Sequence, residues 1–376
     1  MSVFGAIAKH CEVRLVAPLP WWTRQNRPKD WCKAPHENTT GIDAIFPSWW
    51  TIPRFGVAYN GRAMYYSVRK LVKELHKTSP FDVILASWAY PDAYAASLLA
   101  RELGVPFVVN VLGSDINALT KIPALRLQII ETLNRSHRVI SVSHALRESV
   151  LELGVAPEKV VVQHNGVDGV KFRLQNRIQL RERLGLPTDR KIILYVGNWV
   201  PEKGVDILVQ AIGKLKSMGR TDVLLTLVGS GPLEPKLREI VATSGIEAQV
   251  RFCGRKSHAE VPDWMAAADI FCLPSLREGC PNVILEALSC GRPVVASRVG
   301  GVPELMDARY GLMTPAGDPD ALAVTLSQTL DRHWNENELR ETVKNRSWED
   351  VGRGYYSVLE SAVFGERRGE IGEERI

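Results

Sequence analysis

Glu278 and Glu286 are the two residues whose type and position most strongly indicate chemistry. They lie on either side of the point where a loop turns into a predicted helix over residues 282–289. A carboxylate accepts hydrogen bonds from two neighbouring hydroxyl groups at once, so a hexose diol and a ribose diol are natural partners for these acids. The alternative is structural: Glu278 caps the helix and Glu286 is a solvated helix residue.

The residues between these acids predict an anion site at the start of that helix. Pro281 suits the first helical position, because its missing N–H group has no partner there, and Gly291 suits the far end. Free backbone N–H groups near Gly279 and Cys280 would face a phosphate or a sugar oxygen, and the helix dipole would favour the negative charge. Asn282, the first residue after the proline, belongs to the same predicted site.

A second candidate loop follows the apolar run 191–196 and contains Gly197, Asn198 and Lys203. Loops at the carboxyl ends of parallel strands are where α/β proteins bind their ligands. Lys203 is the only cation of this loop, and a fixed ammonium group stabilises the charge that grows on a departing diphosphate without a metal ion. The alternative is that Lys203 is an ordinary exposed lysine.

Two further loops belong to the predicted site. Gly229 and Gly231 follow the apolar run 224–228 and would let the backbone approach a ligand closely. They do not form a dinucleotide-binding fingerprint, because Glu234 occupies the position of its third glycine. Arg255, which follows the next apolar run, either belongs to the same predicted site or is simply solvated.

The size and composition of the chain limit its class. At 376 residues the chain exceeds the ~250–300 at which a single hydrophobic core stops growing, so two domains are expected. Hydrophobic residues make up 45% and charged residues 24%, which excludes a disordered or fibrous protein. The longest apolar runs fall short of the ~18 residues of a membrane span, and no secretion leader is visible, so a cytoplasmic location is expected.

The net charge and the spacing of the cysteines limit the classes of ligand that the protein is expected to bind. A net charge of +5 without a nucleic-acid motif favours phosphate or anionic lipid over nucleic acid. The six cysteines form no C-x-x-C pair and have no zinc-type spacing with histidine, so free thiols and no metal site are predicted. Asp318 and Asp320 form a D-x-D pattern, but their setting predicts a helix cap and not a metal site.

The candidate residues need elements that position them. Short apolar runs alternate with helical patterns, which is typical of parallel α/β sheets. Strands are predicted in the first half at residues 13–17, 83–87, 107–111, 139–142 and 160–163. Strands are predicted in the second half at residues 191–196, 224–228, 250–253, 270–273 and 293–296. A turn-rich stretch between the two series predicts domains over residues 1–170 and 171–347, followed by a helical tail over residues 348–376.

The motifs together resemble those of the retaining sugar-nucleotide glycosyltransferases of GT-B fold, family 4. The resemblance is carried by residues 113–117, 165–168, 196–204, 228–232, 274–275, 278–286 and 291–296. Two further segments are similar to bacterial teichuronic acid and exopolysaccharide transferases, at residues 16–21 and 87–92.

The resemblance implies a fold of two Rossmann-like doubly wound domains that face a cleft. The first would bind the acceptor and the second the donor, and the C-terminal helix would cross back to the first domain. The resemblance also implies that the first domain begins with a strand and a glycine-bearing loop. Residues 1–10 read as the helix after that strand, so the first β-strand is expected to be missing from this sequence.

The same resemblance assigns roles to the candidate residues. Glu278 would hold hexose hydroxyls, Glu286 the ribose diol of the nucleotide, and Lys203 the diphosphate. Neither glutamate would act as a nucleophile, and no enzyme base would be needed, because the resemblance implies that the departing phosphate takes the acceptor proton. Asn198 departs from the pattern, since relatives usually carry an arginine there, and Arg277 is a candidate substitute.

Asp115 is the candidate catalytic residue of the first half. It follows Gly113, after the predicted strand 107–111, and by the resemblance its loop would face the donor site. Asp115 either contacts a hydroxyl of the donor or acceptor or caps the helix that follows. Leu112 stands where many relatives carry a histidine, which removes a polar contact to the donor sugar.

These observations predict metal-independent, retaining transfer of a hexose from a nucleoside diphosphate sugar to a surface polysaccharide or lipid-linked glycan. No cofactor beyond the donor is expected. A second hypothesis is an inactive homologue that binds nucleotide or glycan as a scaffold in a polysaccharide synthesis complex, which the missing strand, Asn198 and Leu112 favour. A third is a sugar-nucleotide epimerase, which would need an acid or base that only Glu278 could supply.

Two surface features of the first half allow more than one interpretation. The segment from Arg62 to Lys77 is an amphipathic helical pattern that either docks on anionic lipid at the inner face of the plasma membrane or covers the sheet. Tryptophans are crowded there and either stack on the acceptor sugar or pack in the core. They are Trp21, Trp22, Trp31, Trp49, Trp50 and Trp88.

Overall fold

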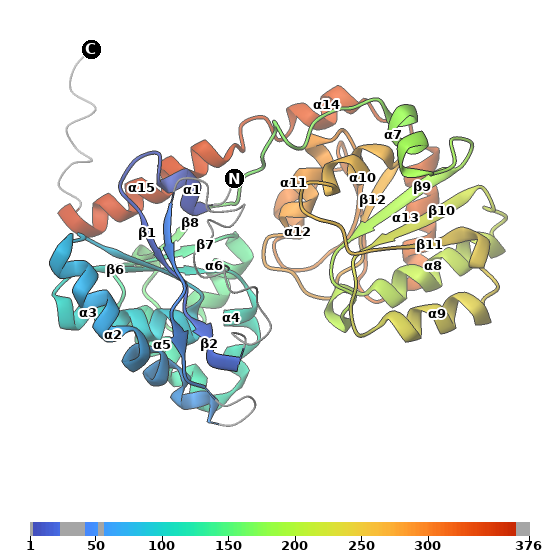
Figure 1. The fold of residues 1–376 in the computed structure, drawn as a ribbon. Coiled ribbons are helices and arrows are strands. Elements are labelled where there is room, and N and C mark those ends of the chain that lie inside the picture. Colours follow the sequence, from blue (N-terminus) through green and yellow to red (C-terminus); the bar gives the residue numbers. More distant parts are fainter. Residues whose placement is uncertain (1–2, 23–41, 52–55, 366–376) are drawn as a thin grey trace, which may run out of the picture. The chain divides into compact units, whose positions relative to one another are not determined.

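The computed structural model describes residues 3–22, 42–51 and 56–365 (Figure 1). The chain divides into two compact units. Unit 1 consists of Met1–Asn165 with Trp348–Ile376, and unit 2 consists of Gly166–Ser347. The boundary predicted after residue 170 falls slightly later in the chain than the division at Asn165. Each unit is an α/β domain, as the alternating sequence pattern predicted.

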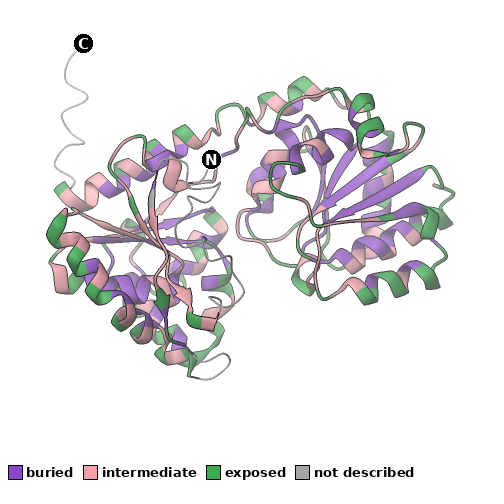
Figure 2. Cartoon of the chain, viewed as in Figure 1, coloured by how far each residue is buried: buried purple, intermediate pink, exposed green. Residues whose placement is uncertain are grey.

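Unit 2 is built on a six-stranded parallel sheet of order β11-β10-β9-β12-β13-β14. Its strands are β9 (Lys191–Val196), β10 (Val223–Val228), β11 (Val250–Gly254), β12 (Ile270–Leu273), β13 (Val294–Ser297) and β14 (Gly311–Thr314). The apolar runs predicted every strand except β14, whose short Gly-Leu-Met-Thr sequence carries no distinct strand signal. Most of the sheet is buried (Figure 2), because parallel strands are covered on both faces.

Helices cover both faces of this sheet. On β9, Ile192 and Leu194 belong to one core cluster, whereas Ile193 and Tyr195 belong to the other, as the two-residue period of a strand requires. The first face is covered by α7 (Arg177–Leu184), α10 (Val261–Ala267), α11 (Asn282–Ser289), α12 (Val302–Leu305) and α14 (Glu336–Glu341). The second face is covered by α8 (Val205–Ser217), α9 (Glu234–Thr243) and α13 (Pro319–Asp331). Asp318 caps α13 by accepting from Asp320 N and Ala321 N, so its predicted role as a cap is confirmed.

Unit 1 contains a four-stranded parallel sheet of order β5-β6-β7-β8. Its strands are β5 (Ile84–Ser87), β6 (Phe107–Val111), β7 (Arg138–Ser141) and β8 (Val160–Val162). The strand predicted at residues 13–17 forms as β1 (Arg14–Val16), which pairs with β3 (Asp43–Ile45); within the described ranges it does not join the larger sheet. A second short pair joins β2 (Leu19–Pro20) to β4 (Ser48–Trp49).

The helices of unit 1 include one from the end of the chain. They are α1 (Val3–Ile7), α2 (Asn60–Thr78), α3 (Tyr94–Leu103), α4 (Ser114–Asn117), α5 (Pro123–Arg135), α6 (His144–Leu151) and α15 (Trp348–Phe364). Tyr355 and Leu359 of α15 pack with Ile7 of α1 and Val108 of β6 in one core cluster (Figure 1). The C-terminal helix therefore returns to the first domain, as predicted.

Helix α2 forms over the predicted amphipathic segment, and its apolar side is buried. Met64, Val68 and Val72 lie in core clusters, which is the behaviour of a helix that covers a domain core. Arg69 and Lys73 both pair with Glu102 of α3, so two of the predicted membrane-facing cations already have a partner. Among the described residues, no helix combines the length and the apolar character that a membrane span needs.

Candidate functional site

The loops that follow β9 and β12 lie against each other at the carboxyl edge of the unit 2 sheet. Leu276 N donates to Glu202 O at 2.8 Å. Gly204 has φ +59°, and a Cβ atom there would lie 2.2 Å from Pro274 O. Only glycine fits so close to a neighbouring carbonyl in this conformation. Because parallel strands end at one edge, these loops occupy the usual ligand position of an α/β fold.

Lys203 and Glu278 form an ion pair between these two loops. Lys203 Nζ lies 2.7 Å from Glu278 Oε1, and the buried Ser275 Oγ donates to the same oxygen at 2.6 Å. The Glu278 side chain is only 8% exposed, whereas that of Lys203 is 34% exposed. A fixed carboxylate thus holds a cation that still reaches the surface, so the cation is available to an anionic ligand. The sequence assigned the two residues to different parts of a ligand and did not predict their pairing.

The predicted glycine loop after β10 packs on the loop after β9. A Cβ atom on Gly229 would lie 1.9 Å from Gly197 O, and one on Gly231 would lie 2.4 Å from Trp199 O. Trp199 N donates to Ser230 O at 3.0 Å and fixes the two loops together. These two positions therefore need glycine because the loop after β9 packs against them. The sequence did not predict this packing role.

Asn198 is exposed between two aromatic residues that anchor its loop. The Tyr195 hydroxyl donates to Asn198 O at 2.9 Å, and the Trp199 indole is almost fully buried. Burial raises the pKa of Tyr195, and the nearby Glu278 charge acts in the same direction. Tyr195 therefore stays neutral and keeps its proton for this hydrogen bond. Arg277 is exposed in the adjacent loop, and Arg255 is exposed after β11.

Helix α11 begins at Asn282, as predicted, and contains Glu286. Pro281 is its N-cap residue, with an extended ψ of 104°, and not the first helical residue that was predicted. Glu286 is half-buried, and burial raises its pKa to about 7, while Lys171 acts in the opposite direction. Asn282 Oδ1 is buried without a hydrogen-bond partner in the described part of the chain. These groups have the capacity to bind hydroxyls.

The loop after β13 also supports the Glu278 segment, which the sequence did not predict. Gly301 N donates to Gly279 O at 2.9 Å. Gly300 has φ +50°, and a Cβ atom there would lie 1.9 Å from Glu278 O. The signal in the sequence is the Gly300-Gly301 pair directly after a strand. Cys280, in the supported segment, is half-buried.

Asp115 has a structural role in unit 1. Its side chain is buried, and its oxygens accept hydrogen bonds from Ala89 N at 2.9 Å, Leu112 N at 3.1 Å and Gly113 N at 2.8 Å. Burial raises the pKa of Asp115, and these three backbone donors oppose that shift. The contact with a ligand hydroxyl stays a prediction, and in this structure the carboxylate accepts from the backbone. It holds the loop before α4 against the residues after β5.

The tryptophans of unit 1 divide between core and surface. Trp49 is buried, whereas Trp50 is 70% exposed and stacks on Trp21 with ring centroids 5.0 Å apart. Trp22 and Trp88 are half-buried, and Trp31 lies outside the described residues. Of the two interpretations, core packing applies to Trp49, and the exposed Trp50 keeps the acceptor-stacking hypothesis open.

Free thiols were predicted, and the structure confirms them for four of the described cysteines. Cys11, Cys253, Cys272 and Cys290 form no disulfide. Cys32 lies outside the described residues.

Two family models match most of the chain. The model "Glycosyltransferase Family 4" matches residues 6–169, and the model "Glycosyl transferases group 1" matches residues 190–332. The chain belongs to glycosyltransferase family 4.

Similar proteins support this family and this fold. The putative teichuronic acid biosynthesis glycosyltransferase TuaC of Bacillus subtilis is 28% identical over 340 residues, which are 89% of this chain and 82% of the relative. The N-acetyl-alpha-D-glucosaminyl L-malate synthase of Bacillus anthracis is 29% identical over 281 residues, 74% of this chain and 72% of that protein. HepE of Anabaena, solved in complex with UDP, superposes with a TM-score of 0.71 at 22% identity, covering 84% of this chain and 86% of that one. The fold of the glycosyltransferase is therefore GT-B.

In this glycosyltransferase the carboxyl edge of the unit 2 sheet combines three kinds of group. A tethered ammonium at Lys203 offers positive charge, and backbone N–H groups at the start of α11 offer hydrogen-bond donors. The carboxylates of Glu278 and Glu286 offer hydroxyl acceptors. This combination suits a ligand that carries both phosphate and hydroxyl groups.

Proposed function

We propose that this glycosyltransferase moves a hexose from a nucleoside diphosphate sugar to a surface polysaccharide or lipid-linked glycan, with retention of anomeric configuration and without a metal ion. The Lys203–Glu278 ion pair of 2.7 Å is the observation that carries the proposal. It sets a cation and a hydroxyl acceptor side by side, as the diphosphate and the hexose are side by side in such a donor.

Each side chain has a distinct proposed role. Lys203 binds the diphosphate and stabilises the charge that develops as the bond to the sugar breaks. Glu278 accepts from hexose hydroxyls through the oxygen that Lys203 and Ser275 leave free. Glu286 accepts from the ribose diol and must be ionised to accept two hydroxyl donors at once. Backbone N–H groups near Gly279 add donors to the phosphate.

Proton transfer in this proposal needs no enzyme base. The acceptor hydroxyl attacks the anomeric carbon on the face from which the diphosphate leaves, and the leaving phosphate oxygen takes the hydroxyl proton. The protein contributes position and electrostatic stabilisation, which can supply most of a rate enhancement. HepE, which shares the fold, was solved with UDP, and this makes uridine diphosphate sugars the first donors to test.

A turnover assay with purified protein tests this proposal. UDP-hexoses are incubated with a glycan or lipid-linked acceptor, and release of UDP and the anomeric configuration of the product are followed. UDP release that depends on acceptor, with an α product from an α donor, supports the proposal. An inverted product contradicts retention, and activity abolished by a chelator contradicts metal independence.

A second candidate function, a nucleotide-binding scaffold without transfer, is favoured by one observation. Asn198 is exposed at the position where the family pattern has an arginine, so the leaving diphosphate has one fixed charge fewer. A protein that binds UDP tightly but releases none from any UDP-hexose, with or without acceptor, would support this second function. Asn198→Arg should then create activity.

Membrane contact through α2 is a further part of the proposal. With Arg69 and Lys73 held by Glu102, the cations left for anionic lipid on this helix are Arg62, Lys70 and Lys77. Binding to vesicles that contain phosphatidylglycerol, compared with neutral vesicles, measures the contact. Loss of binding in the Lys70→Gln, Lys77→Gln double variant supports it, whereas equal binding to both kinds of vesicle contradicts it.

A further inference from the structure

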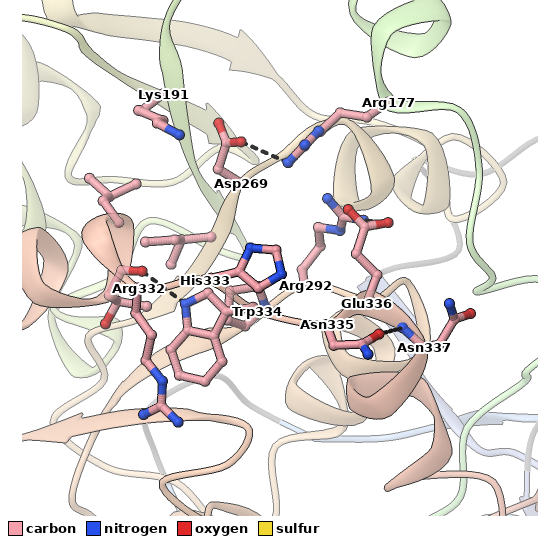
Figure 3. Close-up of a pocket in the computed structure, with 15 residues that line it drawn as sticks. Arg177, Lys191, Asp269, Arg292, Arg332, His333, Trp334, Asn335, Glu336 and Asn337 are labelled. Carbon is pink, nitrogen blue, oxygen red and sulfur yellow. Dashed lines mark hydrogen bonds and ion pairs between the residues drawn. The ribbon is translucent and has the colours of Figure 1, made fainter.

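Unit 2 contains a pocket of about 580 Å³ at the edge of its sheet opposite to the proposed donor site (Figure 3). Lys191 at the start of β9, Asp269 just before β12 and Pro293 just before β13 line it. The strands are parallel, so Lys191 at this edge lies roughly 20 Å along β9 from Gly197, where the loop of the donor site begins, at ~3.3 Å per residue. The volume falls within the ~300–1,000 Å³ of small-molecule sites.

The two carboxylates that line the pocket are already neutralised. Asp269 Oδ1 lies 2.8 Å from Arg177 Nη1, and Asp269 Oδ2 lies 2.7 Å from Arg181 Nη2. Glu336 Oε2 lies 2.6 Å from Arg292 Nη2. Asp269 thus has two arginine partners and Glu336 has one, so these acids offer little repulsion to an incoming anion.

Two more cations on the pocket wall, Lys191 and Arg332, form no ion pair of 4 Å or less with an acid in the described part of the chain. Lys191 is exposed and makes no ion pair within the described ranges. Arg332 stacks over the Trp334 ring at 4.2 Å from its centroid, which leaves the edge of its guanidinium group free to donate. Asp222, just before β10, already pairs with Arg220, whose Nε lies 3.0 Å from Asp222 Oδ1. That hydrogen bond lowers the pKa of the Asp222 carboxyl, and the charge of Lys191 acts in the same direction. The pocket therefore carries an excess of positive charge.

The remaining groups suit a ligand that is larger than a simple anion. Arg292 is only 1% exposed, and its guanidinium group is held by Glu336 and by the carbonyl oxygens of Cys290 and Ala268. In Figure 3 the His333 ring lies near the middle of the labelled side chains, with Lys191 and Asp269 on one side of it and Trp334 and Arg332 on the other. His333 and Asn337 add neutral polar groups, and Trp334 adds apolar surface. In such a pocket a cation would bind an anionic group, the polar side chains would bind hydroxyls, and the aromatic ring would pack against the ring of a sugar.

We propose that this pocket binds an anionic monosaccharide, one that carries a phosphate or a carboxylate, at a site separate from the donor site. Lys191 binds the anionic group, and Arg332, His333 and Asn337 bind hydroxyls. The proposal is independent of the function of the donor site, because it depends on residues at the amino-terminal ends of the strands.

Calorimetric titration of the full chain at low salt tests the pocket with glucose 6-phosphate, glucuronate, glucose and inorganic phosphate as probes. We expect one of the two charged sugars to bind, and glucose and inorganic phosphate to bind far more weakly or not at all. The charged sugar that binds identifies the source of the anion. Equal affinity for glucose, equal affinity for inorganic phosphate, or no binding of either charged sugar would each overturn the proposal.

Matched variants locate the bound sugar. Lys191→Gln and Arg332→Gln should each weaken binding roughly tenfold, because each removes a charge-assisted hydrogen bond. Lys121→Gln, at an exposed lysine of unit 1, removes the same charge elsewhere and should leave binding unchanged. Lys203→Gln should also leave it unchanged. Loss of binding in Lys203→Gln with full binding in Lys191→Gln would place the sugar in the donor site and refute the pocket.

These variants also have a folding control. Lys191 and Arg332 are exposed, so their thermal unfolding midpoints should match that of the unaltered protein. If Arg332→Gln lowers the midpoint through its stacking on Trp334, Lys191→Gln alone decides the result. An unchanged affinity in a folded Lys191→Gln variant would contradict the proposed role of that lysine.

Discussion

Lys203 Nζ lies 2.7 Å from Glu278 Oε1, although the two residues are 75 positions apart in the sequence. They meet because β9 and β12 are neighbours in the sheet and their carboxyl-terminal loops pack together. The Glu278 carboxylate is fixed by the Ser275 hydroxyl, and it in turn holds the Lys203 ammonium group at the carboxyl edge of the sheet. Positioning of this kind lets a site stabilise developing charge without reorganising during the reaction.

Removing the ammonium group should slow transfer. Lys203→Ala should lower kcat by ~10²-fold or more, as the loss of one preorganised group that stabilises developing charge does in other enzymes. The measurement is steady-state release of UDP from the preferred donor. Lys214→Ala is the matched control, because Lys214 pairs with Asp320 on the surface away from the site. An unchanged kcat in Lys203→Ala would contradict its role.

Removing the hydroxyl that fixes Glu278 should affect both stability and donor binding. Ser275→Ala deletes a buried hydrogen bond to a charged group, so the free energy of unfolding should fall by about 1.5–3 kcal/mol. Urea unfolding measures this change, and titration of UDP-hexose should show weaker binding. Ser289→Ala is the control: its buried hydroxyl donates to Phe172 O at 2.6 Å, so it should lower stability but leave donor affinity intact. Equal donor affinity in both variants would show that Ser275 does not position Glu278.

The raised pKa of Glu286 predicts a pH dependence of binding. Burial raises the pKa of Glu286 from 4.5 to about 7 in the folded protein. The ionised form is needed to accept two ribose hydroxyls, so donor affinity should rise as pH increases from about 6 to about 8. Glu286→Gln should bind more weakly at pH 8 and lose this dependence. A pH profile that is the same in Glu286→Gln would assign the titration to another group.

The same pKa shift predicts how stability depends on pH. A carboxyl group with a raised pKa binds more protons when folded than when unfolded. The free energy of unfolding contributed by Glu286 should therefore decrease as pH rises from about 4.5 to about 7 and then level off. Glu286→Gln should lack this decrease. Urea unfolding of both proteins at a series of pH values measures the difference, and parallel curves would contradict the shift.

Gly204 should tolerate substitution worse than another glycine in the same conformation. Gly204 has φ +59° and its Cβ position is 2.2 Å from Pro274 O, whereas Gly104 has φ +72° with nothing within 4 Å. Gly104→Ala should lower the free energy of unfolding by about 1–2 kcal/mol, from backbone strain alone. Gly204→Ala should lower it by more and weaken donor binding, because the two loops must separate. Equal losses in thermal unfolding would show that the loops do not need this contact.

The sequence predicted the elements of unit 2 better than their contacts. Each strand except β14 was visible as an apolar run, and α11 was visible from Pro281 and Gly291. The Lys203–Glu278 pair was not predictable, because periodicity does not reveal that β12 lies beside β9 in the sheet. The sequence also indicates that something approaches Gly229 and Gly231 closely. Whether a ligand or a neighbouring loop does so depends on the same strand order.

Asp115 shows a second limit of the sequence. An aspartate at the start of a short helix has two common roles, as a cap or as a functional group, and both fit the local pattern. Its actual partners include Ala89 N, which follows a different strand, so only the folded chain shows that the carboxylate joins two loops through three backbone N–H groups. For residues at the ends of neighbouring strands, the sequence therefore predicts the side-chain partners least well.

The central claim is that the carboxyl edge of the unit 2 sheet holds a nucleoside diphosphate, and titration of UDP into three variants tests it most directly. We predict that Lys203→Ala and Glu286→Ala each weaken UDP binding roughly tenfold or more, from the loss of charge-assisted hydrogen bonds, and that Lys214→Ala binds as the unaltered protein does. Equal UDP affinity in all three variants would contradict the claim.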